Sequence, residues 1–235
     1  LVGLPHAGGA ASFFAPWRGL LPAGWRLFAA KYPGREDRIE QRRVSTLGEI
    51  VEGVLGEFTG APEAPGAGGR GVVLFGHSMG AVVAFELALR LAGTGRPPVL
   101  LGVSGKSPAD EVGFFDPADG AGAVGSGLAE RVLRLDPLFA EVEKVPELRD
   151  HSLDVIGQDL DLLRAHRMSP GVLAGVPILA VGGTEDPSCG AGDLDAWRAR
   201  TTGPLARLDL PGGHFYIREH VPEVVAAIVA AVAEG

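Results

Sequence analysis

The chain has a single cysteine, Cys189, among its 235 residues. One cysteine cannot form an internal disulfide framework or a cysteine cage for a metal ion. Basic residues are also few: 21 Lys and Arg stand against 29 Asp and Glu, which gives a formal net charge of -8. An acidic balance argues against non-specific nucleic-acid binding, so we expect no nucleic-acid partner.

Long hydrophobic runs are absent as well. The longest apolar run, at residues 224–232, falls short of the ~20 residues that a transmembrane helix needs. The chain starts with Leu1-Val2-Gly3-Leu4, without an initiator Met and without the charged start of a signal peptide. We therefore expect that further residues precede Leu1, that the protein is cytoplasmic, and that no membrane is its partner.

Apolar residues and glycine are plentiful instead. Hydrophobic residues make up 46% of the chain, which is ample for a buried core and excludes disorder as a description of the whole. The length fits one domain with a sizeable core, or one domain that carries a large insertion.

Short apolar runs alternate with longer stretches of helical spacing. The expected strands are residues 2–4, 27–31, 71–75, 99–104, 176–181 and 205–210, and the expected helices are residues 12–21, 47–58, 79–91, 193–200 and 222–233. This alternation implies βαβ units, and therefore an α/β fold with a parallel sheet and helices on both faces.

Residues 107–167 interrupt the alternation. They contain no convincing strand, but residues 127–135 and 146–166 have helical spacing and high charge. We interpret them as a helical lid insertion over the carboxyl edge of the sheet, where open α/β folds bind ligands. Residues 1–106 and 168–235 then form the core, and a decorative insertion is the alternative.

One motif points directly to nucleophilic catalysis. Gly76-His77-Ser78-Met79-Gly80 has the pattern G-x-S-x-G, and it lies between an expected strand and an expected helix. In that context the serine occupies a tight, strained turn, and the flanking glycines keep side chains from crowding it. The helix N-terminus favours developing negative charge. Ser78 is therefore the predicted nucleophile.

A serine hydroxyl needs a base, and the base needs an acid that orients it. His214 follows the strand at residues 205–210, so it lies at the same sheet edge as Ser78 and is the predicted base. The acid is expected after an intervening strand, where Asp186 stands. Glu185 and Asp110 remain open as alternatives, because Glu185 is adjacent and Asp110 follows the strand at residues 99–104.

The oxyanion hole requires two backbone N–H groups. One comes from the residue after the nucleophile, Met79, and the other from the loop that follows the first strand. In that loop, Pro5-His6-Ala7-Gly8-Gly9, Ala7 is the predicted second donor. His6 is interpreted as structural, because His214 is already the better base.

Together these residues resemble the stand-alone type II thioesterases of polyketide and nonribosomal peptide assembly lines, which have the α/β-hydrolase fold. The resemblance extends over nearly the whole chain. Its most discriminating part is Tyr32-Pro33-Gly34-Arg35-Glu36-Asp37-Arg38, which nothing in serine hydrolase chemistry demands. Further matches are Phe85-Glu86-Leu87-Ala88 and Gly213-His214-Phe215.

The resemblance implies a mostly parallel central sheet with helices on both faces and a helical lid. It implies that Ser78, Asp186 and His214 form a triad, with Ala7 and Met79 at the oxyanion hole. The implied activity is hydrolysis of acyl groups from the phosphopantetheine arm of acyl or peptidyl carrier proteins, which clears stalled or aberrant units. The implied substrate is thus an acyl thioester held by a partner protein. No metal and no dissociable cofactor is required, and we expect a monomer.

Two other functions stay open. A carboxylesterase or an acyltransferase of the same fold would carry the same triad, because many chemistries share it. A non-catalytic binding protein would have lost catalysis, and the intact set of Ser78, Asp186 and His214 argues against that.

The negative charge is concentrated in the predicted lid. Residues 107–167 carry a net charge of -7, whereas residues 1–106 carry +3. Within the latter, residues 31–43 hold five basic and three acidic side chains. We hypothesise that an acidic carrier protein docks near these residues, since charge complementarity orients an encounter. A merely solvated charged strip is the alternative.

Overall fold

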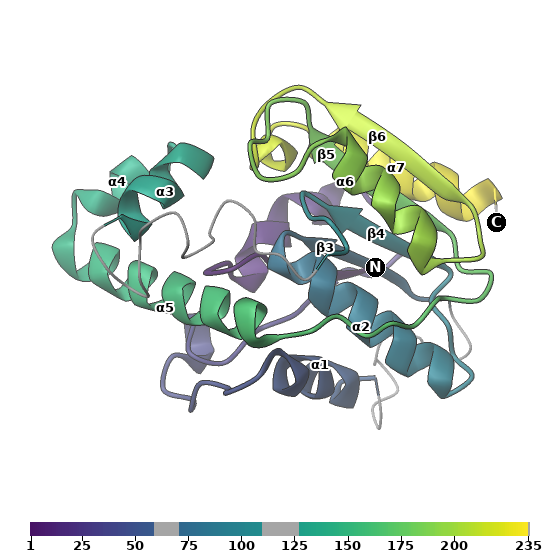
Figure 1. The fold of residues 1–235 in the computed structure, drawn as a ribbon, viewed down its shortest axis with the longest axis horizontal. Coiled ribbons are helices and arrows are strands. Elements are labelled where there is room, and N and C mark those ends of the chain that lie inside the picture. Colours follow the sequence, from purple (N-terminus) through teal and green to yellow (C-terminus); the bar gives the residue numbers. More distant parts are fainter. Residues whose placement is uncertain (59–70, 110–126, 235) are drawn as a thin grey trace.

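The computed structural model describes residues 1–58, 71–109 and 127–234. Its centre is a sheet of six parallel strands in the order β2-β1-β3-β4-β5-β6 (Figure 1). The strands are β1 (Val2–Leu4), β2 (Phe28–Ala29), β3 (Val73–His77), β4 (Leu100–Ser104), β5 (Ile178–Gly183) and β6 (Leu205–Leu210). In the ladder His77 lies opposite Ser104, and Ser104 lies opposite Val181, so the central strands end at one common edge.

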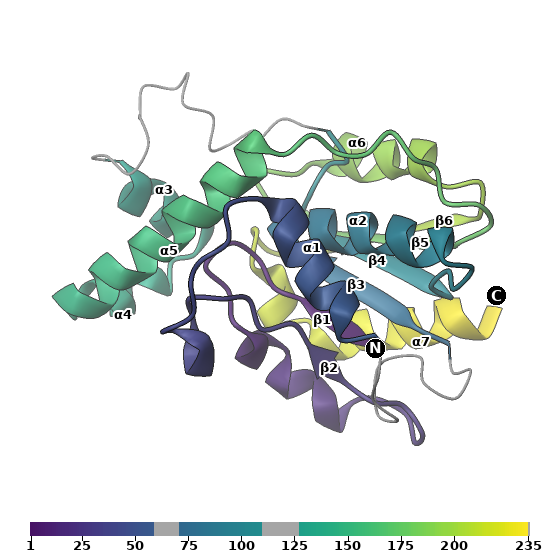
Figure 2. The same cartoon turned by 90° about the horizontal axis from the view of Figure 1, so that it is seen from below.

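Helices cover both faces of this sheet (Figure 2). One face carries α1 (Leu47–Gly56), α2 (Met79–Gly93) and α6 (Ala191–Asp195), which the 3-10 helix η6 (Ala196–Arg200) continues. The other face carries α7 (Val221–Glu234) and the 3-10 helix η1 (Ala11–Gly19). Two further 3-10 turns are η2 (Glu36–Arg38) and η7 (Tyr216–Arg218).

The central strands are buried on both sides. Leu74, Leu101 and Ile178 pack in the apolar cluster under α1, α2 and α6. Phe75, Leu100 and Leu179 pack in a second cluster under α7 and η1. This two-sided burial is the reason that these strands read as nearly continuous apolar runs in the sequence.

Where the structure describes it, the insertion has three helices that extend beyond the carboxyl ends of the strands (Figures 1 and 2). They are α3 (Leu128–Leu135), α4 (Phe139–Glu143) and α5 (Pro146–Ala165). Leu128, Val132, Phe139 and Leu160 form a small apolar cluster of their own. The helices therefore support one another, and α5 also packs on the core through Leu163.

Both ends of the insertion are tied to the core. Glu86 of α2 accepts hydrogen bonds from the backbone N–H of Ser169 at 2.7 Å and from the imidazole of His166 at 3.0 Å. Arg200 donates to the carbonyl oxygens of Pro108 and Ser169, each at 3.1 Å. These bonds hold together the two chain segments near Pro108 and Ser169, where the insertion leaves and rejoins the core.

The alternation of strands and helices expected from the sequence is confirmed, with some differences in the elements themselves. The expected helix at residues 12–21 is the 3-10 helix η1, and Pro16 inside it has no N–H to donate to an α-helical ladder. Strand β2 has only two residues in the ladder. Helix α4 was not predicted, because five residues are too few to show a helical period.

The strand order reverses between β1 and β3, so the loops after these two strands diverge and leave a crevice. The turn after β3 is packed against the end of β1 with no room for side chains. A Cβ on Gly80 would lie 2.0 Å from the carbonyl oxygen of Leu4, and one on Gly76 would lie 1.9 Å from the carbonyl oxygen of Gly80. Both positions therefore require glycine, because neighbouring backbone atoms lie too close to admit a side chain.

Replacing either glycine should be severely destabilising. We expect Gly76→Ala and Gly80→Ala each to lower the free energy of unfolding by about 3 kcal/mol or more, since backbone must move to admit the methyl group. Gly53→Ala is the matched control, because Gly53 is exposed in α1 and a Cβ added there would meet nothing within 4 Å. It should stabilise the protein by up to about 1 kcal/mol. Urea unfolding measures all three, and equal effects would contradict the packing argument.

Candidate active site

Ser78 occupies the turn between β3 and α2 in a left-handed backbone conformation, with φ +55° and ψ -120°. Few residues other than glycine adopt positive φ, and such strain is found mainly at functional sites. The backbone N–H of Ser78 donates to the carbonyl oxygen of Ser104 at 2.7 Å, which fixes the turn to β4. The sequence prediction of a strained strand-to-helix turn is confirmed.

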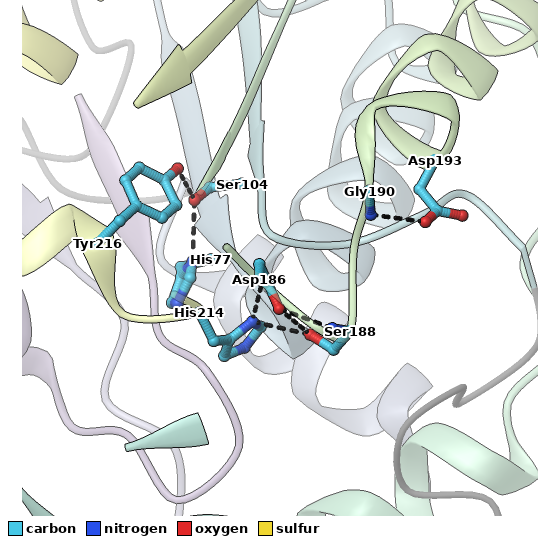
Figure 3. Close-up of polar contacts among 8 residues, drawn as sticks. All are labelled: His77, Ser104, Asp186, Ser188, Gly190, Asp193, His214 and Tyr216. Atoms are coloured by element: carbon cyan, nitrogen blue, oxygen red, sulfur yellow. Dashed lines mark hydrogen bonds and ion pairs between the residues drawn. The ribbon is translucent and has the colours of Figure 1, made fainter. Parts of the chain in front are cut away.

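His214 and Asp186 are brought together from the loops after β6 and β5 (Figure 3). Nδ1 of His214 lies 2.7 Å from Oδ2 of Asp186, and both side chains are buried. The neighbouring Glu185 is exposed. Asp110, the other alternative for the acid, lies outside the described residues. Asp186 is therefore the carboxylate that orients His214.

Ser188 is a further member of this site that sequence reasoning missed. Its hydroxyl donates to Oδ1 of Asp186 at 2.6 Å, and its backbone N–H donates to the same oxygen at 2.8 Å. The hydroxyl also lies 3.0 Å from Nδ1 of His214. The signal was present as Asp186-Pro187-Ser188, because an Asp side chain commonly accepts from the backbone two residues later.

The hydrogen bonds decide the charge state of Asp186. Burial works against the ionised carboxyl, but the bonds from His214 and Ser188 outweigh it and lower the pKa of Asp186 below its usual value. A carboxylate that stays ionised can hold an imidazole in one tautomer and stabilise the imidazolium.

Two more histidines lie beside His214 and are held neutral. The ring of His77 is 4.9 Å from that of His214, and Nδ1 of His77 lies 2.9 Å from the hydroxyl of Ser104, which bonds in turn to Tyr216 at 2.7 Å (Figure 3). Burial, and then the charge of His214, lower the pKa of His77 well below the usual value. Burial likewise lowers the pKa of His6 to about 3.

His6 has the surroundings of a structural residue, as predicted. Its ring packs edge-on against Phe13 and Phe215, each with centroids 4.8 Å apart. Gly105 fills the remaining space between the rings of His77 and His214, since a Cβ there would lie 3.0 and 3.2 Å from them. The three imidazoles thus share one tightly packed region of the site.

A cavity of about 390 Å³ opens over these residues. Ser78, His214 and Ala7 lie on its core side. The insertion supplies apolar side chains on the other side, among them Val132, Phe139 and Leu160. Ser78 and His214 therefore face a space that the insertion lines with apolar side chains and with some polar ones, such as Asp136 and Ser152. A mixture of apolar walls and a few polar groups is usual for a small-molecule site.

Of the two predicted oxyanion donors, one follows Ser78 in the chain and the other lines the same cavity as Ser78. Met79 is the first residue of α2, so its N–H belongs to the free end of a helix. Ala7 lines the cavity in the loop after β1.

Asp136, at the end of α3, pairs with Arg218 at 2.6 and 2.8 Å and joins the insertion to the segment that follows His214.

The basic segment at residues 31–43 differs from the expected row of exposed cations. Arg35 is buried. Lys31 pairs with Asp37 at 2.8 Å, and Arg43 pairs with Asp154 of α5 at 2.7 Å. Much of the positive charge of this segment is therefore neutralised within the protein.

Within the described ranges, no group of three or more His, Cys, Asp or Glu side chains is placed to hold a metal ion. Nor does any helix in those ranges have the length and apolar character needed to cross a membrane. Cys189 lines the cavity, where burial raises the pKa of its thiol to about 12. A thiol with so high a pKa is a poor nucleophile at neutral pH.

Comparison with known proteins places the chain in a family. A family model described as "Thioesterase domain" matches residues 1–232. A Streptomyces griseus protein named "Probable cadicidin biosynthesis thioesterase" is 30% identical over 237 residues, which cover 99% of this chain and 62% of that protein. The chain therefore spans less than two thirds of that relative's length.

Solved structures agree. RedJ, a thioesterase from the prodiginine biosynthetic pathway of Streptomyces coelicolor, matches with a TM-score of 0.83 and 27% identity over 98% of this chain and 84% of that one. BorB, a type II thioesterase from the borrelidin biosynthetic cluster, matches with a TM-score of 0.74 and 29% identity over 98% of this chain and 91% of that one. The resemblance seen in the sequence is confirmed, and the chain belongs to the thioesterase domain family.

Proposed function

We propose that this thioesterase hydrolyses acyl groups from the phosphopantetheine arm of acyl or peptidyl carrier proteins, through a triad of Ser78, His214 and Asp186. The observation that carries the proposal is the hydrogen bond between His214 and Asp186, on the same cavity as the strained Ser78 turn. The relatives named for biosynthetic pathways support a carrier-bound substrate.

The steps of the reaction follow from the orientation of His214. Because Nδ1 of His214 pairs with Asp186, Nε2 is left to take the proton of Ser78. The Ser78 oxygen attacks the thioester carbonyl, and the N–H groups of Ala7 and Met79 stabilise the oxyanion. Collapse breaks the carbon–sulfur bond, and His214 returns the proton to the leaving thiol. A water molecule, deprotonated by His214, then attacks the acyl-enzyme and frees the carboxylic acid and Ser78. This sequence uses no metal or dissociable cofactor.

The insertion is proposed as the lid of this site, with residues 1–106 and 168–235 as the core. Its apolar side chains, such as Val132, Phe139 and Leu160, would contact the acyl chain, whereas the thioester would lie beside Ser78 and His214. A covered apolar site excludes water during acylation and strengthens the hydrogen bonds to the oxyanion. A carrier protein that docks at residues 31–43 would contact Arg42, because Arg42 is the exposed arginine of that segment.

Ser78→Ala should abolish turnover. We expect kcat to fall roughly 10⁴- to 10⁶-fold on acyl-carrier thioesters, because no acyl-enzyme can form. Ser45→Ala, at an exposed position before α1, should retain wild-type kcat. Hydrolysis is measured on a panel of acyl-carrier proteins and on matched oxygen esters. A strong preference for oxygen esters would favour the carboxylesterase alternative, and transfer to an added thiol or alcohol would favour an acyltransferase.

Ser188→Ala should weaken catalysis without weakening substrate binding. The hydroxyl of Ser188 donates to the ionised Asp186, and bonds to charged groups are worth about 1.5–3 kcal/mol. We expect kcat to fall roughly tenfold or more, with KM nearly constant, because Asp186 orients His214 more loosely. Steady-state kinetics on a small pantetheine thioester measures this, and a change in KM alone would contradict the positioning role.

The acid side of the pH–rate profile should report a single proton. A general base must be neutral to accept the Ser78 proton, so we expect kcat/KM to decline as pH falls. Burial lowers the pKa of His6 to about 3, and burial and then the nearby His214 lower the pKa of His77 well below its usual value, so we expect neither to add a second proton to this limb. We expect a slope of one in log kcat/KM against pH on this limb, and a slope of two would contradict the single-proton assignment.

A further inference from the structure

The loop after β1, residues 5–10, and the start of η1 are held from one side by the block Tyr32–Glu36. Tyr32 donates from its hydroxyl to the carbonyl oxygen of Pro5 at 3.4 Å. Arg35 donates from Nη1 to the carbonyl oxygen of Gly9 at 2.9 Å. Glu36 accepts the backbone N–H groups of Ser12 at 3.1 Å and Ala11 at 3.3 Å. The block therefore holds this loop at both ends and in its middle.

Helix α5 of the insertion holds the same loop from the other side. Oδ2 of Asp159 accepts the backbone N–H of Gly8 at 2.7 Å, and Oδ1 pairs with Nη2 of Arg35 at 2.8 Å. The side chains of Asp159 and Arg35 are only 4% and 9% exposed. Ile156, one turn earlier, packs so closely on Gly8 that a Cβ there would lie 2.3 Å from its Cγ1.

We propose that Arg35 and Asp159 are positioning residues that set the backbone of residues 7–9, and through it the oxyanion donor at Ala7. The inference rests on the proposed function, in which Ala7 supplies that donor. Gly8 N–H and Gly9 carbonyl, the groups that Asp159 and Arg35 hold, lie directly after Ala7 in the chain. An error of about 1 Å in such a position costs roughly a hundredfold in rate.

Charge explains why the two residues occur together. A lone carboxylate beside the loop would oppose the negative charge that develops on the substrate oxygen. Arg35 neutralises Asp159 at 2.8 Å, so the loop keeps the hydrogen bond to Gly8 without that repulsion. The arrangement also makes the oxyanion loop depend on the position of α5, because Asp159 belongs to the insertion and Arg35 to the core.

Phosphonylation of Ser78 by a small phosphonyl fluoride tests the proposal, since this reaction uses the oxyanion hole but no carrier protein. We expect Asp159→Asn to lower the maximal labelling rate roughly 10- to 100-fold, with the probe concentration for half-maximal rate unchanged. Arg35→Met should be slower still, because it leaves the charge of Asp159 uncompensated. The double variant Arg35→Met/Asp159→Leu removes both charges and should label faster than Arg35→Met alone.

Asp154→Asn is the matched control and should label at the wild-type rate. Asp154 lies on the same helix and pairs with Arg43 of the same segment, but it is exposed and lines no part of the cavity. The double variant keeps the test valid if a single variant fails to fold, because replacing both members of a buried pair is tolerated far better than removing one. Wild-type labelling rates in Asp159→Asn and in the double variant would overturn the proposal.

A second measurement separates this inference from the proposed function. Hydrogen exchange of the Gly8 amide, followed by NMR with ¹⁵N-glycine, should be roughly tenfold faster or more in the double variant than in Asp154→Asn, because the amide loses its acceptor. If wild-type Ser78 is not labelled at all, the proposed function fails. The restraint of the loop by Asp159 is then supported by faster exchange and overturned by unchanged exchange.

Discussion

The whole site depends on the close packing of the turn after β3 against the end of β1. Gly76 and Gly80 allow backbone to meet backbone there, and Ser78 is forced into positive φ between them. Because the sheet is parallel, the loops after β5 and β6 reach the same edge and bring Asp186 and His214 to that turn. A side chain at Gly80 would separate β1 from α2, and one at Gly76 would separate β3 from α2. Either change would displace the backbone around Ser78.

Electrostatics in the site distinguish His214 from the other two imidazoles. Burial keeps His6 and His77 neutral, whereas His214 has an ionised partner in Asp186. The buried carboxylate of Asp159 is likewise paired, since it lies 2.8 Å from the guanidinium of Arg35. Charges that leave water are costly unless they are paired and hydrogen-bonded. The insertion thus contributes both the apolar side chains over the cavity and one member of a buried ion pair beneath it.

Much of the site could be predicted because its residues stand next to strand ends. Ser78 and Asp186 follow the apolar runs of the buried strands β3 and β5, and His214 follows the partly exposed edge strand β6. The parallel arrangement of these strands places the three residues at one edge. Ser188 and Asp159 were missed for different reasons. Ser188 bonds to Asp186 within a local turn. That turn becomes part of the site only because Asp186 is also the partner of His214. Asp159 is one of many acidic residues on a charged helix, and its period along α5 does not reveal that it is buried against Arg35.

The sequence by itself determined the alternation of strands and helices, the strained turn at Ser78 and the family, because these depend on local spacing and on contiguous motifs. The block Tyr32–Arg38 was recognisable in the sequence as a family motif, but the contacts that its side chains make were not. Only the tertiary structure decided that Arg35 is buried, that it meets Asp159 from a position 124 residues away, and that both hold the loop after β1. The physical reason is that the burial of a charge depends on which surfaces pack together in the folded protein. The hydropathy pattern along the chain does not reveal which surfaces these are.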